Sequence, residues 1–334
     1  MYILESERVM RVGLAVYGTT YGMGIDPASN RPTITPKQLL DKVNDNGLEG
    51  IELPASMMLG VDTTLVANYA QERGLFITLE TEGYNPAKLA ADIDLSVQLG
   101  AKIMRTIVGG AKLGGDRRPL AGRWQLFLQE ILGDLQEATI FAERAGVNLT
   151  VENHQDLTSE ELLWLCKSID SQHFGITLDT GSTLATAEEP VEFARSVAPY
   201  VKNVHLKDYE LFMYEEGYRL VRCPLGEGVV DFPALLEILS EMCPEVTMSI
   251  EIGALEARNV RVFAEDYWHD YPPRTAAQIA HVLRFVLDSA ITTGDWRSPF
   301  ERNEPVESII AYEDQQLSTS IAYILHLLAQ TDKS

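Results

Sequence analysis

Four residues that can bind a metal ion or move a proton lie at or near the ends of short, β-prone runs. Glu152 ends VNLTVE, Asp179 ends GITLD, and His205 and Glu251 lie next to last in KNVHL and VTMSIEI. Their separations of 27, 26 and 46 residues each correspond to one strand–helix repeat, the last one lengthened by an insertion. One such group alone would more often form a salt bridge, but three buried carboxylates and an imidazole brought together need a cation. These donors favour Mn²⁺, Mg²⁺ or Co²⁺ over structural zinc, which draws more Cys or His.

The four residues share one face of their strands. Alternate strand residues face the same side, and on these runs one set is apolar while the other is polar. We expect the polar set to face inward, and it comprises Thr150, Glu152, His154, Thr177, Asp179, Asn203, His205, Lys207, Thr247, Ser249 and Glu251. Glu52, Thr78 and Glu80 follow the same rule on earlier runs, whereas the pattern around Arg105 fits either direction.

The chain alternates eight such runs with amphipathic helical stretches, which predicts βαβ units and a closed (β/α)8 TIM barrel. Thr158 and Glu161 form a capping-box pattern, and Gly100 and Gly146 lie where helices should end. Inserts at the barrel mouth follow strand seven (209–231, a β-hairpin or long loop) and strand eight (253–274). We expect a catalytic barrel over residues 1–290 and a helical C-terminal extension over 291–334, packed on the barrel or at a subunit interface. The strand runs are 11–17, 50–54, 75–80, 102–108, 147–152, 175–179, 202–206 and 246–252.

Composition excludes several functional classes. The net charge of −22, from 49 acidic and 27 basic residues, argues against a nucleic-acid partner. No GxGxxG motif follows the first strand, which removes the main sign of a dinucleotide site. Three cysteines without CxxC spacing predict neither a disulfide framework nor a zinc ribbon. No apolar run has the length of a membrane helix and the N-terminal residues lack a signal-peptide pattern, so we expect a cytoplasmic protein.

The motifs resemble those of the xylose-isomerase-like TIM barrels, which include sugar-phosphate isomerases and epimerases and the D-tagatose 3-epimerase group. The resemblance covers roughly residues 11–290 and rests on VENH (151–154), TLDTG (177–181), VHLKD (204–208), PLGEGVVDF (224–232) and SIEI (249–252). In the epimerase branch, Glu, Asp, His and Glu at these strand ends hold one divalent metal. The resemblance therefore implies the ligands Glu152, Asp179, His205 and Glu251, with Glu152 and Glu251 also acting as the acid/base pair.

Further residues are candidates for substrate binding. His154 and Lys207 lie on the inward face, although a packed His154 and a salt-bridged Lys207 also fit the pattern. Arg222 and Glu227 lie in the first mouth insert, where Arg222 can bind a carboxylate or phosphate or remain a solvated loop residue. Trp268 lies in the second insert, either stacked on a sugar ring or packed on the tail. Ser182 stands where the epimerases usually carry a histidine, which leaves one substrate donor to be supplied from elsewhere.

Together with the metal-ligand pattern, the resemblance implies a sugar isomerase or epimerase that acts on a ketose or keto-sugar derivative through a metal-stabilised enediolate. Mn²⁺ is the expected cofactor, with Mg²⁺ and Co²⁺ as alternatives. The competing hypothesis is a lyase of the same barrel, which decarboxylates a 3-oxo sugar acid such as 3-oxo-isoapionate or removes the aglycone of a 3-keto C-glycoside. The expected partner is a small sugar or sugar acid. A homo-oligomer built on the amphipathic tail at 305–328, or a small second subunit in the deglycosidase case, also fits.

Overall fold

A closed barrel of eight parallel strands forms the centre of the protein. In this computed structural model, which describes residues 10–331, the strands follow one another around the barrel in the order β1-β10-β7-β6-β5-β4-β3-β2, and β2 pairs with β1. The prediction of a (β/α)8 TIM barrel is confirmed. The barrel strands are β1 (Arg11–Ala15), β2 (Gly50–Pro54), β3 (Phe76–Glu82), β4 (Ile103–Ile107), β5 (Asn148–Glu152), β6 (Phe174–Asp179), β7 (Val201–Leu206) and β10 (Thr247–Ile250).

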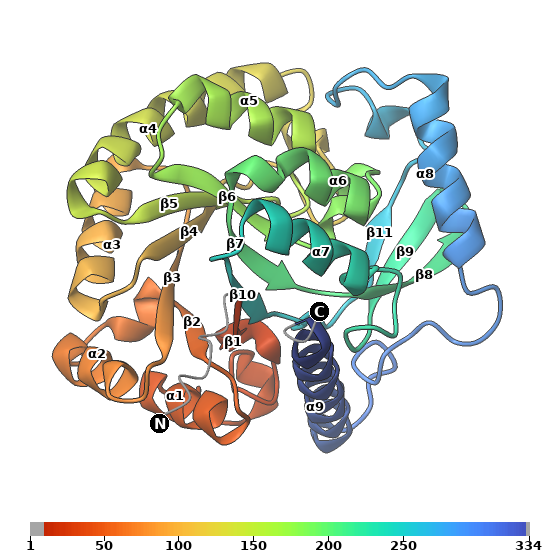
Figure 1. Cartoon of the computed structure of the whole chain (residues 1–334). Helices are drawn as coiled ribbons and strands as arrows, with labels where there is room; N and C mark the ends of the chain where they lie inside the picture. The colour runs from red at the N-terminus through yellow and green to blue at the C-terminus, as the bar shows by residue number, and fades with distance from the viewer. Residues whose placement is uncertain (1–9, 332–334) are drawn as a thin grey trace.

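Helices surround the barrel and cover the outward apolar side chains of its strands (Figure 1). Local signals in the sequence set several helix ends. Thr158 and Glu161 form the expected capping box at the start of α5, and Gly100 and Gly146 end α3 and α4 in the left-handed conformation. The helices are α1 (Pro36–Asp45), α2 (Thr63–Gln71), α3 (Pro86–Leu99), α4 (Trp124–Ala145), α5 (Ser159–Ile169), α6 (Pro190–Val197), α7 (Phe232–Met242), α8 (Ala276–Ser289) and α9 (Val306–Thr331).

The ring of Phe76 lies in the barrel interior near the amino-terminal ends of the strands. This ring lies against Gly50 and Gly13, where an added Cβ would come within 2.3 Å and 2.8 Å of ring atoms. At Gly13 the added Cβ would also approach the carbonyl oxygen of Gly50 to 2.4 Å. Because β1 and β2 each have a glycine here, Gly13 and Gly50, they leave space for the aromatic ring of Phe76 from β3.

The first mouth insert, for which a β-hairpin or a long loop was predicted, forms a β-hairpin. Strands β8 (Tyr209–Tyr214) and β9 (Gly217–Arg222) pair antiparallel, and β11 (Arg258–Val260) from the second insert joins the outer side of β9. The pattern of the sequence gave no sign of β11. This small sheet buries a separate apolar cluster with α8, which includes Tyr209, Leu211, Tyr218, Val282 and Val286.

Helix α9 lies in the ring of helices around the barrel, whereas α8 lies outside that ring on the small sheet (Figure 1). Leu317, Ile321, Ile324 and Leu328 of α9 belong to the main core of the barrel. Glu313 of α9 accepts hydrogen bonds from the backbone N–H groups of residues 20–22, at 2.7 to 2.9 Å. Helix α9 thus packs on the barrel of its own chain. The outermost parts of both predicted units (1–9 and 332–334) lie outside the described residues.

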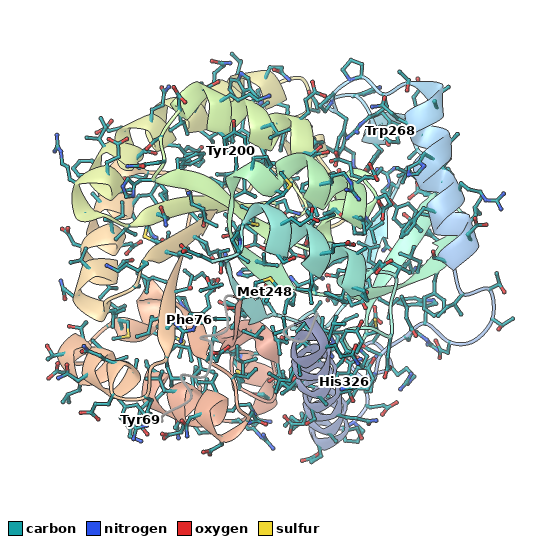
Figure 2. The ribbon with its side chains drawn as sticks, in the orientation of Figure 1. Tyr69, Phe76, Tyr200, Met248, Trp268 and His326 are labelled. Atoms are coloured by element: carbon teal, nitrogen blue, oxygen red, sulfur yellow. The ribbon has the colours of Figure 1, made fainter. Side chains whose placement is uncertain are left out.

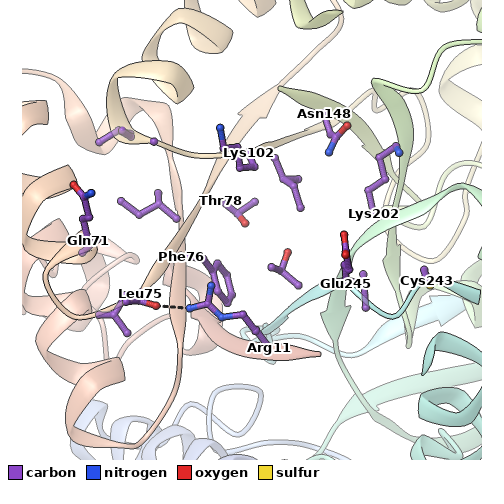
Figure 3. A pocket seen from close by; sticks show the side chains of 18 of the residues that line it. Arg11, Gln71, Leu75, Phe76, Thr78, Lys102, Asn148, Lys202, Cys243 and Glu245 are labelled. Atoms are coloured by element: carbon purple, nitrogen blue, oxygen red, sulfur yellow. Dashed lines mark hydrogen bonds between the residues drawn. The ribbon is translucent and has the colours of Figure 1, made fainter. Parts of the chain in front are cut away.

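A cavity of about 990 Å³ lies at the amino-terminal end of the barrel (Figure 3). Its lining includes residues from the strand starts, such as Arg11, Phe76, Ile103, Asn148 and Thr247. Glu152, Asp179, His205 and Glu251, the cluster predicted from the sequence, lie at the opposite, carboxyl-terminal end of the strands. Barrel enzymes carry their active sites at this end. Among the helices within residues 10–331, none is long and apolar enough to cross a membrane.

Prediction for the barrel interior. Gly13→Ala should lower the free energy of unfolding by about 1–3 kcal/mol, because its Cβ meets the backbone of β2, which cannot easily move. Gly133→Ala is the matched control: this glycine lies exposed inside α4 with nothing near its added Cβ, so alanine should add up to about 1 kcal/mol. Urea unfolding followed by circular dichroism measures both. Equal midpoints for the two variants would contradict this account of the interior.

Candidate metal centre

Glu152, Asp179, His205 and Glu251 converge inside the carboxyl-terminal end of the barrel. Each offers one ligand atom, and these atoms all lie within 4.8 Å of one another. All four side chains are buried. They come from the ends of β5, β6 and β7 and from the residue after β10, which are consecutive around the barrel. The alternation of polar and apolar residues therefore placed all four on the inward face correctly.

His205 turns one ring nitrogen toward the cluster and the other toward Glu52. Its Nδ1 lies 2.9 Å from Glu251 Oε2 and 3.4 Å from Glu152 Oε1, and its Nε2 lies 2.7 Å from Glu52 Oε1. Burial lowers the pKa of His205, but Glu52, Glu152 and Glu251 outweigh burial and raise it well above its usual range. A proton and a divalent cation therefore compete for the same nitrogen, Nδ1.

Arg105 faces inward and joins three carboxylates, which settles the orientation that the sequence left open. Its guanidinium lies 3.0 Å from Glu52 Oε1, 2.8 Å from Glu80 Oε2 and 3.1 Å from Glu152 Oε2. Burial raises the pKa of Glu152, but Arg105 and His205 outweigh it and hold that pKa at about 2. For Glu80 burial dominates, and its pKa rises to about 8 despite Arg105. Glu80 is therefore largely protonated at neutral pH, while Glu152 is ionised.

Lys207 lies against two of the candidate ligands. Its Nζ is 2.7 Å from Asp179 Oδ2 and 3.1 Å from Glu251 Oε2. The other oxygen of Asp179 accepts hydrogen bonds from the N–H groups of Gly181 and Ser182. Burial raises the pKa of Glu251, but Lys207 and His205 lower it well below the usual value for a glutamate. Glu152 and Glu251 are thus held in the charged form that a cation requires.

The cluster fits a divalent cation in two respects. Glu152 Oε1 and His205 Nδ1 face each other at 3.4 Å and are buried without a hydrogen-bond partner among the described residues, while Glu152 Oε2 has the ion-pair contact with Arg105. Buried polar atoms normally have partners, and a shared cation satisfies Oε1 and Nδ1. With Glu80 protonated and His205 neutral, as metal binding through Nδ1 requires, four carboxylates (Glu52, Glu152, Asp179 and Glu251) face two cationic side chains (Arg105 and Lys207). The remaining charge of −2 equals the charge that a divalent ion neutralises.

Two further side chains lie close to the cluster. His154, half-buried, lies near Glu152, and burial lowers its pKa, so it is neutral at physiological pH. Tyr17 follows β1, and burial together with the charges of Glu80 and neighbouring acids raises its pKa to about 12. Both can exchange hydrogen bonds with a substrate above the carboxylates.

The structure places the other predicted site residues in different surroundings. Arg222 ends β9 and is buried, with one guanidinium nitrogen 3.2 Å from Glu313 Oε1 of α9. Glu227 is exposed in the loop after β9. Trp268 donates its indole N–H to the carbonyl of Val262 and packs on Tyr267 and Tyr271, and Figure 2 shows it beside α8. For these three residues substrate contact stays a prediction, whereas His154 and Lys207 do lie at the cluster.

Arg117 links three segments of the barrel mouth through its hydrogen bonds and ring contacts. Its guanidinium binds the carboxylate of Glu161 and lies between the rings of Trp124 and Tyr271, 3.9 and 3.8 Å from their centroids. It also donates to the backbone carbonyls of Asp156 and Asp270. The loop after β4, the loop after β5 and the second insert are thereby joined beside the cluster.

Other residues that position the site gave only weak signals in the sequence. Asn153 of the VENH motif exchanges two hydrogen bonds with the backbone of Asp179, at 2.9 and 2.7 Å, and so fixes the end of β6 beside β5. Asp208 of VHLKD accepts backbone hydrogen bonds from Tyr209, Gly226, Gly228 and Val230. The resemblance covered both motifs, but spacing alone could not show that these side chains bind backbone rather than ligand.

The family model described as "Xylose isomerase-like TIM barrel" matches residues 40–262. The chain belongs to this family. The matched segment contains Glu152, Asp179, His205 and Glu251, and it ends within the second mouth insert.

Two curated relatives share moderate identity with the chain. YihM, an uncharacterized protein of Escherichia coli K12, is 24% identical over 64% of this chain and 66% of its own length. A 3-oxo-isoapionate decarboxylase of Pectobacterium atrosepticum is 26% identical over 50% of this chain and 57% of its own length. The aligned segments thus span less than two thirds of either relative.

Solved structures show the same fold. An L-ribulose 3-epimerase superposes with a TM-score of 0.60 at 16% identity, covering 97% of this chain and 96% of its own. The IolI protein, solved with a bound zinc atom, superposes with a TM-score of 0.55 at 14% identity, covering 84% of this chain and 98% of its own. At these identities the likeness extends to the fold alone.

Prediction for the metal centre. The purified chain should contain about one divalent ion, and Glu152→Gln and Asp179→Asn should lose it, because each removes one charged ligand of four. Glu245→Gln is the matched control, an exposed glutamate at the opposite end of the barrel. Elemental analysis by mass spectrometry measures the content, before and after incubation with Mn²⁺. A chain that takes up no ion in either condition would show that the buried carboxylates are purely structural.

Proposed function

We propose that the protein is a divalent-metal-dependent isomerase or epimerase that acts on a ketose or keto-sugar derivative through an enediolate. The observation that carries this proposal is the placement of Glu152 and Glu251. Strands β6 and β7 separate β5 from β10, so the two glutamates reach the cluster from different sides. Two carboxylates placed in this way can remove a proton from one face of a carbon and return it to the other.

The donor set of three carboxylates and one imidazole supports Mn²⁺, with Mg²⁺ and Co²⁺ as alternatives. When bound, such an ion polarises a ketone oxygen and a neighbouring hydroxyl, which acidifies the C–H bond between them. Glu152, whose pKa of about 2 keeps it ionised, can take the proton from one face of the carbon. Glu251 is also ionised at rest, so it can return a proton to the other face only after it has taken one up from solvent. Lys207, between Asp179 and Glu251, can donate a hydrogen bond to the oxygen on which negative charge develops.

A second candidate is decarboxylation of a 3-oxo sugar acid, which passes through the same enediolate. The 26% identical decarboxylase favours it, and so does Arg258 of β11. The Nε of Arg258 is buried without a hydrogen-bond partner in the described part of the chain. Burial raises the pKa of Tyr209, and the charges of Lys207 and Arg258 oppose that rise. A guanidinium whose Nε has no partner is suited to bind the carboxylate of a sugar acid.

Prediction for the reaction type. Incubation of the Mn²⁺-loaded protein with a panel of ketoses in D₂O should place solvent deuterium at the carbon next to the carbonyl, because an enediolate exchanges its proton with the carboxylates. Proton NMR and mass spectrometry of the recovered sugars detect it. Release of CO₂ from a 3-oxo sugar acid, with no exchange into ketoses, would overturn the epimerase proposal in favour of the decarboxylase.

Prediction for the two glutamates. In an epimerase, Glu152→Gln and Glu251→Gln should each lower turnover by about 10²–10⁴-fold even when the metal is restored by excess Mn²⁺, because each face of the substrate needs its own proton carrier. In a decarboxylase only one proton transfer is essential, so one variant should retain much more activity than the other. Steady-state kinetics at saturating Mn²⁺ separates the cases, with Glu245→Gln as the control. Full activity in both variants would exclude the acid/base pair.

A further inference from the structure

The residues beneath the cluster hold the imidazole of His205 in a single orientation. Its Nε2 lies 2.7 Å from Glu52 Oε1, close enough for an Nε2–H group to donate to the carboxylate. An imidazole protonated on Nε2 keeps its Nδ1 lone pair free, and Nδ1 is the nitrogen that faces Glu152 and Glu251. The contact with Glu52 therefore selects the tautomer that can bind a cation.

Glu52 is itself fixed from several sides. It is fully buried on β2, and its Oε2 accepts a hydrogen bond from Asn203 Nδ2 at 3.2 Å. The amide oxygen of Asn203 in turn accepts from the hydroxyl of Thr247 at 3.0 Å. Glu52 is consequently an acceptor with little freedom to rotate.

Arg105 connects this contact with a second ligand. Its Nε donates to Glu52 Oε1 at 3.0 Å, and its NH1 lies 3.1 Å from Glu152 Oε2. Since the guanidinium is planar and rigid, one side chain sets the relative positions of the two carboxylates. Arg105 thus contacts the ligand Glu152 directly, and it contacts the ligand His205 indirectly, through Glu52.

We propose that Glu52 and Arg105 are positioning residues of the metal centre, which hold the His205 ring with Nδ1 toward the other ligands and fix the orientation of Glu152. This inference rests on the proposed function, because it requires a cation among Glu152, Asp179, His205 and Glu251. A ligand set that is already oriented loses less conformational freedom on binding, and partners of this kind commonly change metal affinity strongly.

Metal affinity provides the first test. Competition with a chromophoric chelator gives the Kd of the full chain for Mn²⁺ and Zn²⁺. Glu52→Gln and Arg105→Lys should each weaken binding about 10–100-fold. Glu80→Gln is the matched control: Glu80 also contacts Arg105 in this buried layer but touches no candidate ligand, so the affinity should not change. If Arg105→Lys fails to fold, Glu52→Gln and Glu80→Gln still decide the question.

A spectroscopic readout separates positioning from a general effect on stability. The chain has six histidines, so ¹⁵N-histidine labelling of the Zn²⁺-loaded protein gives a tractable spectrum. The wild type should show a far-downfield Nε2–H proton that is absent in His205→Asn. This proton should move upfield in Glu52→Gln and stay in place in Glu80→Gln.

The outcomes distinguish this inference from the proposed function. An unchanged Kd and an unchanged proton resonance in Glu52→Gln would overturn the positioning role. A wild-type chain that binds neither Mn²⁺ nor Zn²⁺ would overturn both proposals. If the wild type binds the ion and Glu52→Gln weakens it, but no keto sugar is converted, the positioning role holds and the proposed reaction is wrong.

Discussion

The guanidinium of Arg105 forms ion pairs with Glu52 and Glu152 and contacts the carboxyl group of Glu80 in the interior of the barrel, where water cannot screen the charges. In a low-dielectric interior, carboxylates so close to one another cannot all remain ionised without cations among them. Arg105 on one side and Lys207 on the other provide part of this compensation, and the protonation of Glu80 reduces the remaining demand. Glu152 and Glu251 can therefore stay ionised although they are buried, which any metal-assisted proton transfer at this site requires.

The same requirement explains how polar and apolar residues divide between the two faces of the strands. Because the interior is polar at the carboxyl-terminal end, stability must come from the outward face, where Leu149, Ile176, Val204 and Met248 are fully buried. The segments at the barrel mouth, which are distant from one another in sequence, complete the surroundings of the site. They do so through Arg117 and through the small sheet of β8, β9 and β11. Chemistry and packing are thereby assigned to opposite faces of the same strands.

The strands and the four converging residues could be predicted because both depend on local alternation, which in each run has a clear polar and a clear apolar side. Strand β4 was the exception, since Ile103, Met104 and Ile107 put apolar residues on both faces and left the direction of Arg105 open. The surroundings of Arg222 and Trp268 could not be predicted, because their partners Glu313 and Tyr271 come from segments whose placement depends on tertiary packing. Helix α9 was recognised as amphipathic, but periodicity does not tell which surface its apolar side covers.

The position of α9 has a consequence for the biosynthesis of the protein. Its apolar residues belong to the barrel core, and Glu313 binds the backbone of the loop after β1, 291 to 293 residues earlier in the chain. Contacts so distant in sequence cannot form until α9 has left the ribosome, so the growing chain carries an uncovered apolar surface during most of its synthesis. Chaperone binding during translation should therefore end only after residues 306–331 emerge. In a truncated product that lacks them, the same surface marks the chain for degradation.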